Sequence, residues 1–94
     1  MADIRSPVFH EKFQQRMDVL RDEFPRIDEV MRGIAWELAR DPEIGINDLR
    51  YDVWWVRHVG TIALPPATIW YSFNDRLLLM LTFEMTESGL HELN

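Results

Sequence analysis

The stretch from residue 39 to residue 50, ARDPEIGINDLR, marks the point where the chain changes from a helical to an extended pattern. Before it, apolar residues recur every three or four positions, which is the spacing of one face of an α-helix. After it, β-branched and aromatic residues follow one another in short runs typical of strands. We therefore expect a pair of helices first and antiparallel strands after them.

Apolar stripes divide the first forty residues into two helices. Ser6 and Pro7 fit the N-cap and first position of a helix, because proline there loses only a donor that has no partner. Pro25 interrupts the first stripe, and Asp41-Pro42 ends the second, since the residue before a proline is pushed out of the helical region. An antiparallel helix hairpin over about residues 7–40 is predicted. Its stripes are Phe9, Phe13, Met17, Leu20 and Phe24, then Ile27, Val30, Met31, Ile34 and Leu38.

Three runs in the second half predict antiparallel strands: residues 51–58, 67–73 and 76–85. Asn74-Asp75 forms the tight turn between the last two, and Pro65-Pro66 places a loop before them, because proline cannot donate to a central ladder. The sequence thus predicts an α+β fold, with the N-terminal helix hairpin packed on one face of a small antiparallel sheet of three or four strands. We expect one domain, 1–94, with the sheet at about 51–85 and a tail at 86–94 that forms a helical turn or frays.

Composition restricts the class of protein. The chain is 47% hydrophobic and 12% aromatic, enough apolar material for a folded core. It has no cysteine, so disulfides and thiolate metal sites are excluded, and we expect a cytoplasmic protein. The longest apolar run, Leu77 to Leu81, is far below the ~20 residues that span a bilayer, and the start of the chain lacks a signal-peptide pattern.

The net charge of −6 bears on possible partners. Proteins that bind nucleic acid neutralise phosphates with clustered lysine and arginine, and no segment of this chain is basic. Direct nucleic-acid binding is therefore disfavoured. Nine of the ten basic residues are arginines, with Lys12 the exception, and arginine suits paired carboxylates within a chain or at protein interfaces.

Alternation along the strands decides which side chains reach the helices. Successive residues face opposite sides of a sheet, so Trp54 and Trp55 must diverge. Turning the first strand over would only exchange these two. We place Trp54, Val56, Ile69, Tyr71, Phe73, Leu77, Leu79, Leu81 and Phe83 toward the helices. The outer face, turned away from the helices, then carries Val53, Trp55, Arg57, Thr68, Trp70, Ser72, Leu78, Met80, Thr82 and Glu84.

This outer face is too apolar to meet only water. An antiparallel sheet with one wet side alternates apolar and polar residues, whereas this side combines two tryptophans with aliphatic residues. Three covers remain open: a protein partner, a second copy in a homodimer, or the chain ends at residues 1–6 and 86–94. The residues predicted to bind a partner are Val53, Trp55, Trp70, Leu78 and Met80.

With these elements the chain resembles the RelE/ParE superfamily of toxin–antitoxin toxins, which pack a helical hairpin on a small antiparallel sheet. The similarity runs from about Phe9 to Glu84. Its clearest parts are Asp41-Pro42-Glu43-Ile44, then Leu49-Arg50 and a strand ending in Arg57, then Trp70-Tyr71 with the turn at Asn74-Asp75. Family members usually open with a strand before the first helix. Only Ala2 to Arg5 is available for it here, so that strand is expected to be short or missing.

The resemblance implies an RNA-binding surface that this sequence largely lacks. Ribonuclease members of the family place basic side chains along the outer face, with an arginine that stabilises the transition state. The matching positions here are Val53 and Trp55 for lysines, Thr68 for the arginine, and Met85 or Thr86 for a further arginine. Arg57 alone matches a basic position, so mRNA endonuclease activity is disfavoured and enzymatic activity stays undecided.

Three residues are candidates for catalysis: Arg57 as a cation, His58 as an acid or base near neutral pH, and Glu84 as a general base. The ordinary alternatives are a solvated His58 at a strand edge and a salt bridge between Glu84 and Arg57. Attack by a 2′-hydroxyl also needs cations against the developing phosphorane charge, and the outer face offers few. No metal-ligand spacing, glycine-rich phosphate loop or nucleophile elbow occurs, so we expect no metal and no cofactor.

Two functions from different classes fit these observations. The first is a RelE/ParE-like toxin or toxin homologue of a type II module, whose outer face binds an antitoxin and, when free, the ribosome or gyrase. The second is a non-enzymatic regulatory protein on the same scaffold, phage-derived or homodimeric, whose acidic surface docks a protein. Charge discriminates between them, because a ribosome-directed nuclease should be basic. The isoelectric point of about 4.9 favours binding over cleavage.

Overall fold

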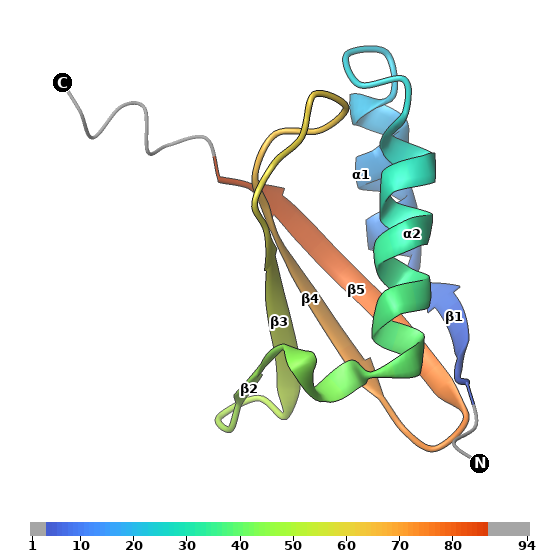
Figure 1. The fold of residues 1–94 in the computed structure, drawn as a ribbon, viewed down its shortest axis with the longest axis vertical. Coiled ribbons are helices and arrows are strands. Elements are labelled where there is room, and N and C mark those ends of the chain that lie inside the picture. Colours follow the sequence, from blue (N-terminus) through green and yellow to red (C-terminus); the bar gives the residue numbers. More distant parts are fainter. Residues whose placement is uncertain (1–3, 87–94) are drawn as a thin grey trace, which may run out of the picture.

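The computed structural model describes residues 4–86 as a mixed α+β structure with two helices against one face of a single sheet (Figure 1). The strand order is β1-β5-β4-β3-β2. β1 pairs parallel with β5, and the other neighbouring strands are antiparallel. The elements are β1 (Ser6–Phe9), α1 (Glu11–Leu20), α2 (Ile27–Arg40), the 3₁₀ turn η1 (Pro42–Ile44), β2 (Ile46–Asp48), β3 (Val53–His58), β4 (Ala67–Phe73) and β5 (Leu77–Met85).

The predicted fold class is wrong in the number and order of its strands. The sheet has five strands instead of three or four, and one of them precedes the helices and is parallel to its neighbour. Ser6 and Pro7 belong to β1, and the helix cap is His10, whose Nδ1 accepts the Lys12 N–H at 3.1 Å. A four-residue edge strand containing proline is too short to show the period of a strand, so the Ser-Pro pair resembles a helix start equally well.

The element boundaries nearer the middle of the chain agree with the sequence. α2 ends at Arg40, immediately before Asp41-Pro42, and the three runs predicted as strands contain β3, β4 and β5. At the predicted turn, the Asn74 side-chain oxygen accepts the N–H groups of Arg76 and Leu77, each at 2.8 Å. Apart from Thr86, the predicted tail at 86–94 lies outside the described residues, so its helical or frayed state stays a prediction.

Both helices cover the sheet with apolar stripes. Two residues of the predicted first stripe lie outside α1, because Phe9 belongs to β1 and Phe24 follows the end of the helix. In α1 the buried residues are Phe13 and Met17, and the Phe13 ring lies 4.7 Å from that of Phe83 on β5. α2 buries the wider face, with five fully buried residues. No helix within residues 4–86 has the length and apolar character needed to cross a membrane. The core comprises Phe13, Met17, Ile27, Met31, Ala35, Leu38, Ala39, Leu64, Ile69, Tyr71, Leu78, Met80 and Phe83.

An ion pair joins the end of α1 to the start of α2. The Arg21 guanidinium donates to both carboxylate oxygens of Asp28, at 2.9 and 3.0 Å, and to Asp18 at 2.8 Å. The hydrogen bonds from Arg21 lower the pKa of Asp28 below its usual value. The pair is partly exposed, so solvent screens it, but its bidentate geometry holds the corner between the two helices.

We expect this pair to make stability depend on acid pH. Because the folded pKa of Asp28 is lower than its unfolded value, the stabilisation is present above the ordinary aspartate pKa of ~3.9 and is lost as pH falls through the folded pKa. Urea midpoints of the wild type and of Asp28→Asn, measured between about pH 2 and 7, should differ most at neutral pH and converge in acid. A difference that is constant over this range would contradict the assignment.

Gly45 permits the segment after α2 to lie against the sheet. The buried Tyr71 hydroxyl donates to the Pro42 carbonyl, and burial raises the pKa of Tyr71 to about 12. A Cβ at Gly45 would overlap the Tyr71 hydroxyl and come within 2.6 Å of the Trp55 carbonyl oxygen. The predicted inward orientation of Tyr71 is confirmed. Only glycine lets η1 and β2 approach β3 and β4 this closely.

Two glycine substitutions should therefore have opposite effects. Gly45→Ala is expected to destabilise the fold by about 1–3 kcal/mol, the cost of overpacking a tight site. Gly33→Ala should stabilise it by about 0.5–1 kcal/mol, because Gly33 lies inside α2 and a Cβ there meets nothing within 4 Å. Urea denaturation of both variants measures the difference. Equal effects of the same sign would contradict the close approach at Gly45.

Candidate functional site: the outer face of the sheet

The two neighbouring tryptophans of β3 point to opposite sides of the sheet. Trp54 packs against the core, with its ring 5.4 Å from that of Phe73. It is in register with the buried Tyr71, whereas Trp55 is in register with Trp70 on the other side. The predicted divergence of the two indoles is confirmed, and Trp55 and Trp70 lie side by side on the outer face.

Two residues predicted for the outer face, Leu78 and Met80, are instead fully buried under the helices. The cause is a β-bulge in β5. Trp70 is in register with Thr82 and Tyr71 with Met80, so Leu81 is an extra residue without a partner on β4. Strict alternation along the strand puts Leu77, Leu79 and Leu81 on the same side as Phe83. The bulge reverses that alternation for the first half of the strand.

Because of the same bulge, the predicted orientation of three leucines toward the helices is wrong. Leu77 is 45% exposed, and Leu79 and Leu81 are only partly buried. Leu79 is in register with Ser72 and with Val8 of β1, so it lies on the outer face in place of its two buried neighbours. Sequence alternation missed Leu79, Val8 and Ile46 as outer-face residues, because neither the bulge nor the two short strands gave a sequence signal.

Substitutions in β5 test this assignment of faces. Leu78→Ala should cost about 2–5 kcal/mol, because it leaves a cavity in the core. Leu79→Ala should cost about 1 kcal/mol, since that side chain is partly exposed and no helix covers it. Thermal or urea unfolding of the two variants compares them directly. A larger loss at Leu79 than at Leu78 would place the bulge elsewhere.

The corrected outer face is arranged in three rows that cross the strands. The first row carries charge at both ends, the second carries the two tryptophans, and the third is mostly aliphatic. Trp55, Trp70, Val53 and Leu79 are all partly buried. In order across the sheet, the rows are Arg57–Thr68–Glu84, then Ile46–Trp55–Trp70–Thr82, then Asp48–Val53 with Ser72–Leu79–Val8.

The three catalytic candidates do not form one cluster. Arg57 and Glu84 are exposed at opposite ends of the first row, with Thr68 between them. The ion pairs found within residues 4–86 include neither of them. His58 is in register with the buried Ala67 and therefore faces the helix side of the sheet. An acid or base at His58 thus has no access to a substrate held over Arg57 and Glu84.

His58 instead lines a small cavity of about 200 Å³ between α2 and β3. Its Nε2 atom is buried and has no hydrogen-bond partner among the described residues. The rest of the lining is mostly aliphatic, and Glu37 and Arg57 also border the cavity. This separates the histidine from the outer face and gives it no role in a reaction there.

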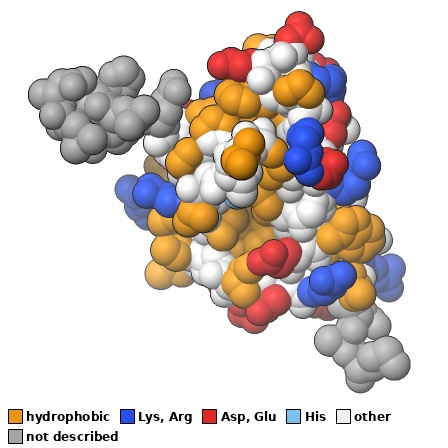
Figure 2. Space-filling view, turned by 45° about the horizontal axis from the view of Figure 1, so that its top comes forward, with side chains coloured by type: hydrophobic (Ala, Val, Ile, Leu, Met, Phe, Trp, Pro, Cys, Tyr) orange, Lys and Arg blue, Asp and Glu red, His pale blue; other side chains and the backbone are white. Residues whose placement is uncertain are grey.

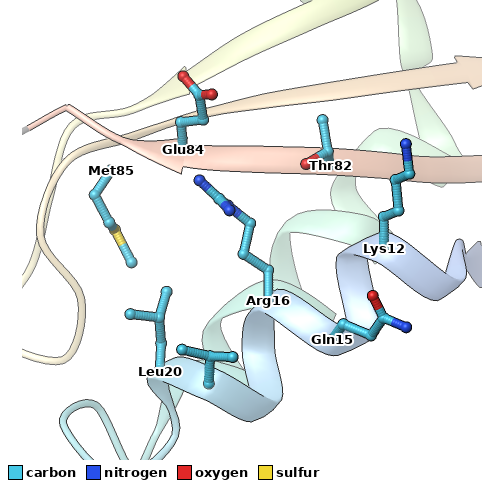
Figure 3. Close-up of a pocket in the computed structure, with 8 residues that line it drawn as sticks. Lys12, Gln15, Arg16, Leu20, Thr82, Glu84 and Met85 are labelled. Atoms are coloured by element: carbon cyan, nitrogen blue, oxygen red, sulfur yellow. The ribbon is translucent and has the colours of Figure 1, made fainter.

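A larger groove, of about 790 Å³, runs between α1 and the second half of β5 (Figure 3). β1 pairs with β5 only as far as Met80, so the edge beyond it faces α1. Arg16 reaches from α1 to this edge, and its Nε donates to the Phe83 carbonyl. Glu84 points away from α1, on the opposite side of β5 from Arg16. Arg16 thus gives one carbonyl of this unpaired strand edge a hydrogen-bond partner.

Apolar side chains also reach the surface in the loops on either side of β3. Leu49 and Tyr51 precede the strand and are 88% and 69% exposed, and Val59 and Ile62 follow it. In the view of Figure 2, hydrophobic side chains form several surface groups separated by acidic and basic ones. No element formed by residues 4–86 covers the outer face (Figure 1), and residues 1–3 and 87–94, part of the predicted alternative cover, lie outside the described range.

No protein-family model matches the chain, and no curated protein matches its sequence. Within the described part of the chain, no three histidine or carboxylate side chains gather as metal ligands. The outer face combines a partly buried aromatic and aliphatic centre with charged residues along one border. Such an arrangement is typical of protein interfaces, where tryptophan and arginine contribute most to affinity.

Proposed function

We propose that this protein is a RelE/ParE-like toxin, or a homologue of one, that acts in the cytoplasm by binding proteins through the outer face of its sheet. The observation that carries the proposal is that Trp55 and Trp70 lie together on this face, flanked by Val53 and Leu79, with both helices on the opposite side. An antitoxin-like chain would cover these side chains in the inactive complex. The ribosome or gyrase would be the target of the free protein.

The strand order supports the family resemblance. Members of this family usually have a strand before the first helix. β1 is such a strand, and it is formed by Ser6–Phe9 instead of the segment from Ala2 to Arg5 that the sequence left for it. The remaining similarity still rests on the spacing between Asp41-Pro42, Arg57 and Trp70-Tyr71. Together they support the choice of a toxin scaffold over an unrelated α+β domain.

The charges favour binding over RNA cleavage. Val53, Trp55 and Thr68 lie on the outer face at positions where the resemblance implies basic residues. Arg57 is the single basic residue of the three rows, and the face lacks a histidine beside it. The net charge of −6 also opposes approach to ribosomal RNA. Contacts with a protein component of the target fit these properties better than phosphate contacts.

The acidic surface also supports a second candidate, a non-enzymatic regulatory protein on this scaffold, phage-derived or homodimeric, that docks a protein partner and needs no antitoxin. The gene neighbourhood distinguishes the two. A short adjacent reading frame that encodes an amphipathic, antitoxin-like segment favours the toxin, and its absence favours the regulator.

Induced expression in a bacterial host tests the proposal. We expect the wild type to arrest growth and the product of the adjacent gene to relieve the arrest. The double variant Trp55→Ser/Trp70→Ser should inhibit growth at least tenfold less strongly than the wild type, because it lacks the aromatic centre of the outer face. Trp36→Ser is the matched control, since Trp36 is 45% exposed on α2, on the other side of the sheet.

The outcomes separate the alternatives. Arrest that persists in the double variant would show that the outer face is not the binding surface. Normal growth of cells expressing the folded wild type would reject the toxin and leave the regulator. Purified ribosomes supply the remaining comparison: mRNA cut by the wild type but not by Arg57→Ala would establish a nuclease and overturn the preference for binding.

A further inference from the structure

The two charged residues of the first row lie at equivalent places on either side of β4. Arg57 on β3 and Glu84 on β5 are in register with the same residue, Thr68 of β4. Neighbouring strands are about 4.8 Å apart, so the two charges stand about equally far from β4, on opposite sides and at the same height along the strands. They are exposed and form no ion pair with each other within the described chain.

We propose that a second copy of this chain packs on the outer face, related to the first by a twofold axis that runs along β4 between the two sheets. Such an axis exchanges the β3 side with the β5 side and preserves height along the strands. Arg57 of each copy therefore meets Glu84 of the second copy, which gives two equivalent ion pairs at the border of the interface.

The apolar rows match under the same operation. Trp70 of β4 lies on the axis, so the two Trp70 rings meet each other, an arrangement in which aromatic pairs add to the energy of burial. Trp55 meets Thr82 of the second copy, its row mate on β5. Val53 meets Leu79 in the same way, because both lie in the third row. On the three central strands the operation thus pairs Arg57 with Glu84 and sets apolar side chains against one another or against Thr82. Thr68 and Ser72 lie on the axis and each meets its own copy.

The other twofold axis in the plane of the interface gives no such match. An axis perpendicular to the strands sets β3 against β3 of the second copy, so Arg57 faces an apolar residue or another Arg57 and stays unpaired. Aligned sheets cross at about 30°, which displaces side chains one strand from the axis by roughly 2–3 Å. Arginine and glutamate side chains are long enough to absorb this displacement.

The size of the face limits the strength of the dimer. Three rows across three to four strands cover roughly 300–400 Å² on each copy, about half of the ~800 Å² per partner of a standard interface. Exposed side chains beside β3, such as Tyr51 and Ile62, add some area. The net charge of −6 on each copy opposes association. We therefore expect a dissociation constant in the micromolar range. The dimer then forms at high protein concentration and dissociates when a partner with higher affinity binds the outer face.

Charge reversal and mixing test the proposal on the full chain. Sedimentation equilibrium from about 5 to 500 µM should show the wild type passing from monomer to dimer. Arg57→Glu and Glu84→Arg should each weaken the dimer at least tenfold, because each places like charges at both border contacts. A one-to-one mixture of the two variants should restore association, since the heterodimer has opposite charges at both contacts. The double variant R57E/E84R should also dimerise.

Matched controls separate the ion pairs from net charge. Arg32→Glu and Glu23→Arg change the total charge by the same amounts at exposed sites of the helix layer, and should leave the dissociation constant within about twofold of the wild type. A wild type that is monomeric at 500 µM overturns the proposal. So does a mixture of the single variants that stays monomeric while the double variant dimerises, because that pattern indicates an ion pair within one chain. The inference rests on the register of the charged row and is independent of toxin activity.

Discussion

A strand can turn only every second side chain toward a layer of helices, and in this chain both helices lie on the same side of the sheet. The apolar residues of β3, β4 and β5 outnumber the positions that this side offers. The surplus, with Trp55 and Trp70 at its centre, is left on the outer face. The core, the apolar outer face and the proposed dimer all follow from this division of side chains between the two faces.

The bulge at Leu81 decides how β5 takes part in that division. Before the bulge, Leu78 and Met80 enter the core; after it, Phe83 does. A strand of constant alternation would leave either the first pair or Phe83 outside the core. One extra residue therefore lets a nine-residue strand pack against β1 and α2 at one end and against α1 at the other. The same bulge determines that Leu79 completes the third row of the outer face.

The positions of the titratable groups weaken any catalytic role for this surface. His58 and Arg57 are neighbours in sequence, yet alternation sends the histidine to the helix side and the arginine to the outer face. Glu84 shares a row with Arg57 but is separated from it by Thr68. A reaction at phosphorus needs a cation and an acid or base at the same place, and alternation puts His58 on the other side of the sheet from Arg57. Charges spaced across an apolar face are better suited to fix the register of a protein partner.

Local patterns were sufficient for the features that depend on neighbouring residues. The stripes of α1 and α2, the end of α2 before Asp41-Pro42, the Asn74-Asp75 turn and the divergence of Trp54 from Trp55 could all be read from the sequence, because periodicity, proline sterics and alternation act within a few residues.

Other features depended on contacts between distant segments. β1 is a strand only because β5, some seventy residues later, supplies its hydrogen-bond partners, and β2 exists because Gly45 allows it to approach Trp55 and Tyr71. The bulge likewise arises where β5 must serve two packing environments at once. The sequence by itself thus determined the helices, the long strands and the excess of apolar side chains, whereas the tertiary structure decided the edge strands and which leucines form the outer face, since pairing and packing across the whole chain select among locally equivalent alternatives.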